Sequence, residues 1–171
     1  MSTRAADQVT VVEPGHDPRP LGPGVGVDFK IHGDHTGGAL SIVEHPFEVG
    51  ALVPPHIHTL EDEISIVLEG EMGFRSGDQE VVLGAGGYIV KPRGEVHAMW
   101  NAGTTPARMI EIITPAGFED YFRELSDTVA NGEFSMEAVV ELAQRFQLPF
   151  AEPDWLPEVI ERYGLTPPPT M

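Results

Sequence analysis

Short apolar runs separated by turn residues occupy the chain from Val25 to Thr114. The runs are VGVDFKIH, ALSIVEHPFEV, EISIVLEG, EMGFRS, EVVLG, YIVKP, VHAMWN and ARMIEIIT, and glycine, proline or aspartate marks most of the breaks between them. Turn signals at intervals of roughly 8 to 12 residues, without helical periods between them, are typical of antiparallel sandwiches and barrels. We therefore expect an all-β sandwich or barrel over residues 25–115.

Two segments of different character flank this stretch. Residues 1–24 are rich in proline and glycine, so we expect an arm, although the valines at positions 9, 11 and 12 are suited to a short edge strand. After residue 115 the apolar spacing becomes helical, as in the series Phe118, Tyr121, Phe122 and Leu125. We predict that residues 116–171 form a helical extension that packs on the outside of the sheet or over its mouth.

Two more helices are predicted within this extension. Ser135 is suited to cap the first of them, and Asp154 to cap the second, which we expect to reach Tyr163 before Gly164 ends it. Amphipathic helices this short need a surface to pack against. We therefore expect them to cover the barrel and not to build a core of their own.

The acidic composition narrows the classes of partner. The chain has 27 acidic and 10 basic residues, a formal net charge of −17. Nucleic acids and anionic membranes attract basic surfaces, so we expect neither as a partner. No apolar run approaches the roughly 20 residues of a transmembrane helix, and the first residues lack the apolar core of a signal peptide, so we expect a cytoplasmic protein.

Potential metal ligands lie close together in GALVPPHIHTLEDEISIVLEG, residues 50–70. Cysteine is absent, which leaves histidine and carboxylate as ligands. Because side chains alternate along a strand, we expect His56 and His58 on one face of a hairpin whose second strand carries Glu63. His97 follows the turn Pro92-Arg93-Gly94 and opens another strand. These residues can supply ligands from several strands without any helix.

The spacing of these residues matches a family pattern. The first half is Gly50, His56, His58, Glu63 and Gly70, and the second is Gly86, Pro92, Gly94, His97 and Asn101, with fifteen residues between the halves. The two halves resemble the paired signature of the cupin superfamily. The resemblance implies a double-stranded β-helix, a jelly-roll-like barrel, in which His56, His58, Glu63 and His97 hold one divalent transition metal.

The ligand types are consistent with that assignment. Imidazole suits Fe, Ni, Cu and Zn, and a carboxylate also suits Mn, so the metal stays open among Fe, Mn, Ni, Co, Cu and Zn. Four protein ligands leave a six-coordinate ion two positions for substrate, water or dioxygen. The other histidines lack such support: we expect His16 to be solvated in the arm, and His32, His35 and His45 to lie in loops, at strand ends or on the surface.

A second resemblance concerns the reaction. The segment TPAGFEDYFREL, residues 114–125, is similar to the segment that leaves the barrel in cupins of the quercetin 2,3-dioxygenase type. This implies a dioxygenase acting with dioxygen on an enolisable, hydroxylated aromatic (flavonol-like) substrate, with Glu63 as the catalytic group that accepts the substrate proton. Strand parity places Ser65 with Glu63 and Met99 with His97, so we predict both to face the substrate pocket.

Two other functions stay open. The same ion can act as a Lewis acid without oxygen, in an isomerase, cyclase or lyase. Alternatively, the barrel can be a non-catalytic module that binds a small molecule, although no helix-turn-helix segment with a basic surface accompanies it. Barrels of this size commonly pair, so we expect a homodimer.

Overall fold

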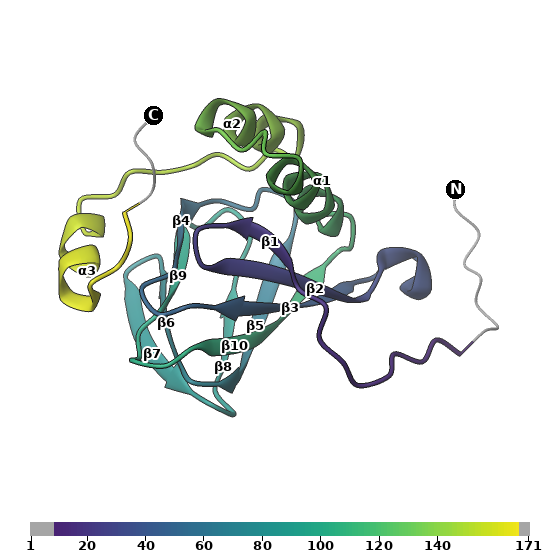
Figure 1. The fold of residues 1–171 in the computed structure, drawn as a ribbon, viewed down its shortest axis with the longest axis horizontal. Helices are drawn as coiled ribbons and strands as arrows, with labels where there is room; N and C mark the ends of the chain where they lie inside the picture. The colour runs from purple at the N-terminus through teal and green to yellow at the C-terminus, as the bar shows by residue number, and fades with distance from the viewer. Residues whose placement is uncertain (1–8, 168–171) are drawn as a thin grey trace.

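The computed structural model describes residues 9–167 and contains two antiparallel sheets that face each other as a jelly roll (Figure 1). The first sheet contains, in spatial order, β1 (Arg19–Gly22), β2 (Val25–Ile31), β3 (Ser41–Phe47), β10 (Ala107–Thr114), β5 (Asp62–Glu69) and β8 (Tyr88–Lys91). The second contains β4 (Leu52–His56), β9 (His97–Asn101), β6 (Glu71–Ser76) and β7 (Gln79–Gly84). The predicted all-β fold with a C-terminal helical part is confirmed.

Residue alternation explains the barrel core. Along β3, β5 and β10, every second side chain is buried, and the residues between them are half-buried. Val43, Val67 and Met109 lie on the inward face with at most 1% exposure. Burial of such side chains removes apolar surface from water, which stabilises the closed pair of sheets.

The predicted hairpin of the histidine-rich segment is wrong. The strand β4 pairs with β9, whereas β5 pairs with β10 and β8, so the two strands belong to different sheets. After His56 the chain leaves the strand, because the Ile57 amide donates a hydrogen bond to the carbonyl of Pro149 in the C-terminal segment. His58 therefore lies beyond the strand end and not on the same strand face as His56.

The N-terminal segment contributes an edge strand at a different place from the valines. Within the expected arm, β1 pairs with β2, whereas Val9, Val11 and Val12 are exposed and lie outside any strand. Residues 1–8 of the arm lie outside the described residues, as do Pro168 and Pro169 at the other end. The division into arm, barrel and extension stays a prediction.

Three helices follow the barrel, as predicted: α1 (Glu119–Ala130), α2 (Met136–Arg145) and α3 (Leu156–Tyr163). Ser135 caps α2, since its side chain accepts a hydrogen bond from the Ala138 amide at 3.1 Å. The predicted Asp154 cap of α3 is wrong, because the N-cap is Trp155, which makes no side-chain capping bond, whereas the predicted end at Tyr163 before Gly164 is confirmed. None of the helices in the described chain combines the length and apolar character needed to span a membrane.

The helices cover two parts of the barrel. Figure 1 shows α1 and α2 over one end of it and α3 beside the second sheet. In α3, Val159 is fully buried in a small apolar cluster with Leu52 of β4 and Trp100 of β9. The end of the barrel under α1 and α2 is where the histidine-rich segment leaves β4, so these two helices enclose the candidate site.

Candidate metal centre

The four predicted ligands converge inside the barrel. His56 ends β4, His58 follows it, Glu63 lies on β5 and His97 begins β9. Each is at most 4% exposed, and one potential ligand atom from each lies within 4.8 Å of the others. Two sheets and one loop thus bring together residues that are far apart along the sequence.

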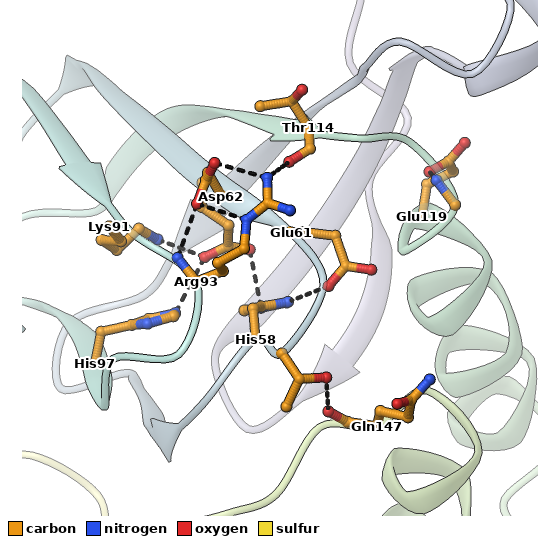
Figure 2. Close-up of polar contacts among 12 residues, drawn as sticks. His58, Glu61, Asp62, Lys91, Arg93, His97, Thr114, Glu119 and Gln147 are labelled. Atoms are coloured by element: carbon orange, nitrogen blue, oxygen red, sulfur yellow. Dashed lines mark hydrogen bonds and ion pairs between the residues drawn. The ribbon is translucent and has the colours of Figure 1, made fainter.

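Each imidazole is oriented by a hydrogen bond at Nδ1. The acceptors are the Pro54 carbonyl for His56 at 2.7 Å, the Glu61 carboxylate for His58 at 3.3 Å, and the Glu95 carbonyl for His97 at 3.1 Å. The His58–Glu61 contact is visible in Figure 2. Such partners fix the tautomer of a metal-binding histidine and leave Nε2 free for the ion.

The turn Pro92-Arg93-Gly94 is bonded to the start of β5 and positions His97. The Arg93 guanidinium and amide both bond to the Asp62 carboxylate, at 2.8 and 2.9 Å (Figure 2). The Gly94 amide donates to the His58 carbonyl at 2.7 Å, and Gly94 has a φ of 80°, which glycine adopts without strain. The chain is thereby set to bring His97 back beside His56, its register partner.

The arrangement fits a cation. His97 Nε2 is buried without a hydrogen bond, although it lies 3.2 Å from Oε2 of Glu63. With the proton on Nδ1, both of these atoms are acceptors; Lys91 donates to the Glu63 oxygen, whereas His97 Nε2 has no donor among the described residues, and a bound cation would supply its partner. His58 Nε2 lies 3.1 Å from the other Glu63 oxygen. Three imidazoles and one carboxylate are a ligand set for a divalent transition metal.

The charges of the centre are strongly shifted by burial and by one another. Burial opposes ionisation of Glu63, but the positive charges of His58 and Lys91 outweigh it and hold the pKa of Glu63 well below its usual value. Burial also opposes the charge on His58, yet Glu63 and Glu61 raise its pKa to about 9. Burial lowers the pKa of His56 and of His97. Two of the three imidazoles are thus kept neutral, the form that binds metals.

A buried lysine that the sequence interpretation missed adjoins the centre. Lys91 Nζ lies 2.8 Å from Glu63 Oε2 and 3.1 Å from Glu111 Oε2, and the lysine is fully buried. Ser65 completes this network by donating to Glu111 at 2.9 Å. Burial, reinforced by the charge of Glu63, raises the pKa of Glu111 to about 7 despite the nearby lysine. Lys91 is therefore the cation that balances the two buried carboxylates.

A cavity of about 570 Å³ opens onto the ligands. Its lining includes the two histidines of the 56–58 segment and Glu63, and most of the rest is apolar and comes from the barrel and the helices. Phe118 packs edge-on against the His58 ring, with centroids 4.2 Å apart, and Tyr121 and Leu125 of α1 extend the apolar wall. Among the described residues that line the cavity there is no lysine or arginine.

The structure places the other two predicted site residues in different surroundings. Met99 lines the cavity, whereas Ser65 faces inward from β5 and is bonded to Glu111. Their role in substrate binding stays a prediction. The expectation for His45 is wrong: it lies in the middle of β3, is 4% exposed and lines the cavity. The neighbours of His45 on β3 explain the error, since half-buried residues on either side hide its inward orientation in the sequence pattern.

Fold and site together define a small β-barrel protein with a candidate metal centre inside the barrel. Residues 44–113, which contain all four candidate ligands, match the family model of the cupin domain. This part of the chain is a cupin domain.

Curated relatives match only part of the chain. A germin-like protein of Arabidopsis thaliana, subfamily T member 2, is 40% identical over 42% of this chain and 34% of its own length. Quercetin 2,3-dioxygenase of Bacillus subtilis is 27% identical over 60% of this chain and 30% of its own length. Oxalate oxidase GF-2.8 of Triticum aestivum is 38% identical over 37% of this chain and 32% of its own length. The chain thus spans about a third of the length of these relatives.

Solved structures support the fold. KdgF from Halomonas sp. superposes with a TM-score of 0.55 at 24% identity, covering 61% of this chain and 93% of that one. The polyketide cyclase RemF from Streptomyces resistomycificus superposes with a TM-score of 0.50 at 24% identity, covering 61% and 80%. At this identity the similarity is one of fold.

Proposed function

We propose that the protein is a metal-dependent dioxygenase acting on an enolisable, hydroxylated aromatic substrate of the flavonol kind. The observation that carries the proposal is the opening of a four-ligand centre onto an apolar cavity of about 570 Å³. An apolar pocket with a few convergent polar groups is typical of sites for planar organic ligands. The sequence similarity to quercetin 2,3-dioxygenase supports the same substrate class.

The residues of the centre have distinct roles in this proposal. His56, His58, Glu63 and His97 hold one divalent transition metal, either Fe, Mn, Ni, Co, Cu or Zn. The metal, when bound, supplies Lewis acidity toward the oxygen anion of the substrate and, for a redox-active ion, reactivity with dioxygen. Glu63 takes the hydroxyl proton of the substrate, because it is an ionised carboxylate that lies both in the ligand set and in the cavity wall.

The surroundings of the centre favour a neutral aromatic over a small dianion. Oxalate, the substrate named for four cereal relatives of the chain, carries two negative charges. Here the described cavity wall offers no lysine or arginine to receive them, and Lys91 behind it is already shared by two carboxylates. Phe118, Tyr121 and Phe122 instead provide flat apolar surfaces. We therefore disfavour oxalate as the substrate.

Oxygen dependence tests the proposed reaction. Metal-loaded protein is mixed with quercetin in an oxygen-electrode cell, and substrate absorbance and dioxygen are followed together. We expect one dioxygen to be consumed per flavonol lost, and no loss of flavonol under strict anaerobiosis. Turnover that continues unchanged without oxygen would exclude a dioxygenase.

The second candidate function is an isomerase, cyclase or lyase that uses the ion as a Lewis acid. It is favoured by the same apolar cavity, which can also enclose a polyketide-like chain, and RemF is a cyclase of related fold. Anaerobic turnover is its expected signature. A non-catalytic binding role would instead show stoichiometric retention of a flavonol with no turnover under either atmosphere.

A homodimer and a cytoplasmic location also stay proposals. The outward face of the first sheet carries an apolar row in register across four strands: Ile42, Ile112, Ile64 and Val90. Two copies of a chain with a net charge of −17 repel each other, so this apolar row is where they can meet. Light scattering of wild type and Val90→Glu tests this: we expect a dimer that the variant weakens, and a monomeric wild type would overturn it.

A further inference from the structure

His45 occupies the cavity without a role in the centre described above. It lies on the inward face of β3 and is 4% exposed. Its Nδ1 is 2.7 Å from the carbonyl oxygen of Gly26. A carbonyl oxygen only accepts hydrogen bonds, so Nδ1 carries the proton, and Nε2 is left with an unshared lone pair. The geometry thereby fixes the tautomer of this histidine.

The environment of the ring keeps it neutral. Phe122 packs edge-on at a centroid distance of 5.0 Å, and Phe47 lies at 6.5 Å. Burial, the largest effect, lowers the pKa of His45 to about 4, against the opposing effects of the Gly26 bond and Glu63. Near neutral pH the side chain is thus a permanent hydrogen-bond acceptor. Of the two ring nitrogens of His45, only Nδ1 has a hydrogen-bond partner among the described residues, so Nε2 has none there. The ring borders the cavity.

An acceptor of this kind selects its ligand. A ligand that fills the cavity shields this acceptor from water; leaving it unpaired then costs free energy, and a ligand hydroxyl directed at it removes that cost. A pocket built to hydrogen-bond a hydroxyl discriminates strongly against the analogue that lacks it, whereas an apolar wall does not. Phe118, Phe122 and Met99 can make apolar contacts with an aromatic ring, but their side chains cannot distinguish a ring that carries a hydroxyl from one that does not.

We propose that His45 is a specificity-determining residue whose Nε2 accepts a hydrogen bond from a ring hydroxyl of the aromatic substrate, distinct from the oxygen that meets the metal ligands. This inference deepens the proposed function, since it takes the substrate class from it. It restricts that class to aromatics bearing at least one further hydroxyl. His45 of β3 and Glu63 of β5, which both face inward with β10 between their strands, then recognise two different oxygens of one ligand.

Two substitutions separate recognition from support of the fold. In His45→Asn, the amide nitrogen takes the place of Nδ1 and keeps the bond to Gly26, but nothing replaces Nε2. In His45→Gln, the amide oxygen can reach the position of Nε2, and the Gly26 bond is lost. If His45 only supports the fold, the asparagine variant should bind the ligand better than the glutamine variant. If His45 recognises the ligand, the glutamine variant should bind it better.

The experiment compares the affinities of metal-loaded wild type and variants for quercetin and for 3-hydroxyflavone under anaerobic conditions. Both ligands carry the 3-hydroxyl group, and only quercetin carries further hydroxyls on its other rings. We expect wild type to prefer quercetin by about tenfold or more, the worth of one buried hydrogen bond. His45→Asn is expected to lose this preference, because its affinity for quercetin falls further than its affinity for 3-hydroxyflavone, and His45→Gln is expected to recover part of it.

Failure of this inference and failure of the proposed reaction give different results. A quercetin preference that survives in His45→Asn overturns the role of His45, even if the wild type consumes dioxygen with quercetin. A preference that disappears in His45→Asn supports the role, even if no oxygen is consumed and the reaction is not a dioxygenation. Equal affinity of the wild type for the two ligands, or binding of neither, overturns the inference outright.

Discussion

Lys91 Nζ lies 2.8 Å from Oε2 of Glu63, and both side chains are shielded from solvent. The two residues are register partners on β8 and β5, so the pairing of the strands itself sets their contact. Because the same ammonium also reaches Glu111, one cation compensates two buried carboxylates. The ligand carboxylate of the centre is therefore held from behind by a residue that does not line the cavity.

Removal of that cation is expected to destabilise the protein. Lys91→Met leaves two carboxylates buried together, and breaking a buried ion pair costs about 3–5 kcal/mol. Urea unfolding of the metal-free proteins measures the change. The double variant Lys91→Met/Glu111→Gln removes one of the stranded charges, so it should regain part of the lost free energy of unfolding. Equal stability of wild type and Lys91→Met would show that the lysine does not balance these groups.

The histidine ligands are expected to control metal content. His58→Ala and His97→Ala each remove one imidazole from a four-ligand set, so elemental analysis should fall from close to one equivalent to a small fraction of that. His35→Ala, which removes a histidine of the short 3-10 helix η1 (Gly33–Thr36) outside the site, serves as the matched control and should keep full occupancy. The same metal content in all of these proteins would contradict the assignment of the centre.

Glu63→Gln tests the proposed proton acceptor. The amide keeps an oxygen that can bind a metal but cannot accept a proton, so we expect partial metal occupancy and loss of oxygen-dependent turnover. The control is Glu69→Gln, on the same strand but 63% exposed at its side chain, which should retain activity. Turnover by Glu63→Gln at the wild-type rate, normalised to metal content, would remove Glu63 from the reaction.

His45 makes the stability of the metal-free protein depend on pH. Its folded pKa of about 4 lies below the ordinary value of 6.5, so the unfolded chain takes up the proton first as the pH falls. The contribution is fully present above pH 6.5 and is lost progressively down to pH 4, a change of about 3 kcal/mol. Urea unfolding across this range should show the extra loss in wild type relative to His45→Asn. Parallel curves for the two proteins would mean that His45 titrates normally.

Gly73 is expected to be sensitive to the smallest side chain. A Cβ atom there would lie 2.1 Å from Nε1 of Trp100, its fully buried partner on β9. We expect Gly73→Ala to lower the free energy of unfolding by about 1–3 kcal/mol, because the core has to shift to admit it. Gly84→Ala is the control on the adjoining strand, since a Cβ at that position meets no atom within 4 Å. Thermal melts of the pair decide the comparison.

The strands were predictable because turn residues delimit them. The run ARMIEIIT coincides with β10 and EMGFRS with β6. The direction in which each side chain points was harder to predict, because apolar residues occupy both faces of the first sheet. On β10, Ile110 and Ile112 point outward while Glu111 points inward, the reverse of what a half-buried strand normally shows. This is why the charged network behind the centre was not found from the sequence.

The ligands were predictable from their spacing, but their strand partners were not. His56 and Glu63 are near neighbours in sequence, which suggested a hairpin, yet they lie in opposite sheets. Strand pairing between distant segments, such as His56 with His97, depends on the closed barrel and leaves no local signal. The cavity-lining role of His45 was missed for the same reason, since its neighbours in space come from β2 and α1.

The division of the ligands between opposite sheets means that an intermediate with only one sheet assembled holds no complete coordination shell. Cation uptake is thus expected to report that the barrel has closed, with partly assembled chains left empty. A metal ion that binds the native state alone shifts the folding equilibrium toward that state, so in a cell that supplies the ion only fully folded molecules would be stabilised by it. The metal would then serve as a checkpoint of maturation as well as a reagent.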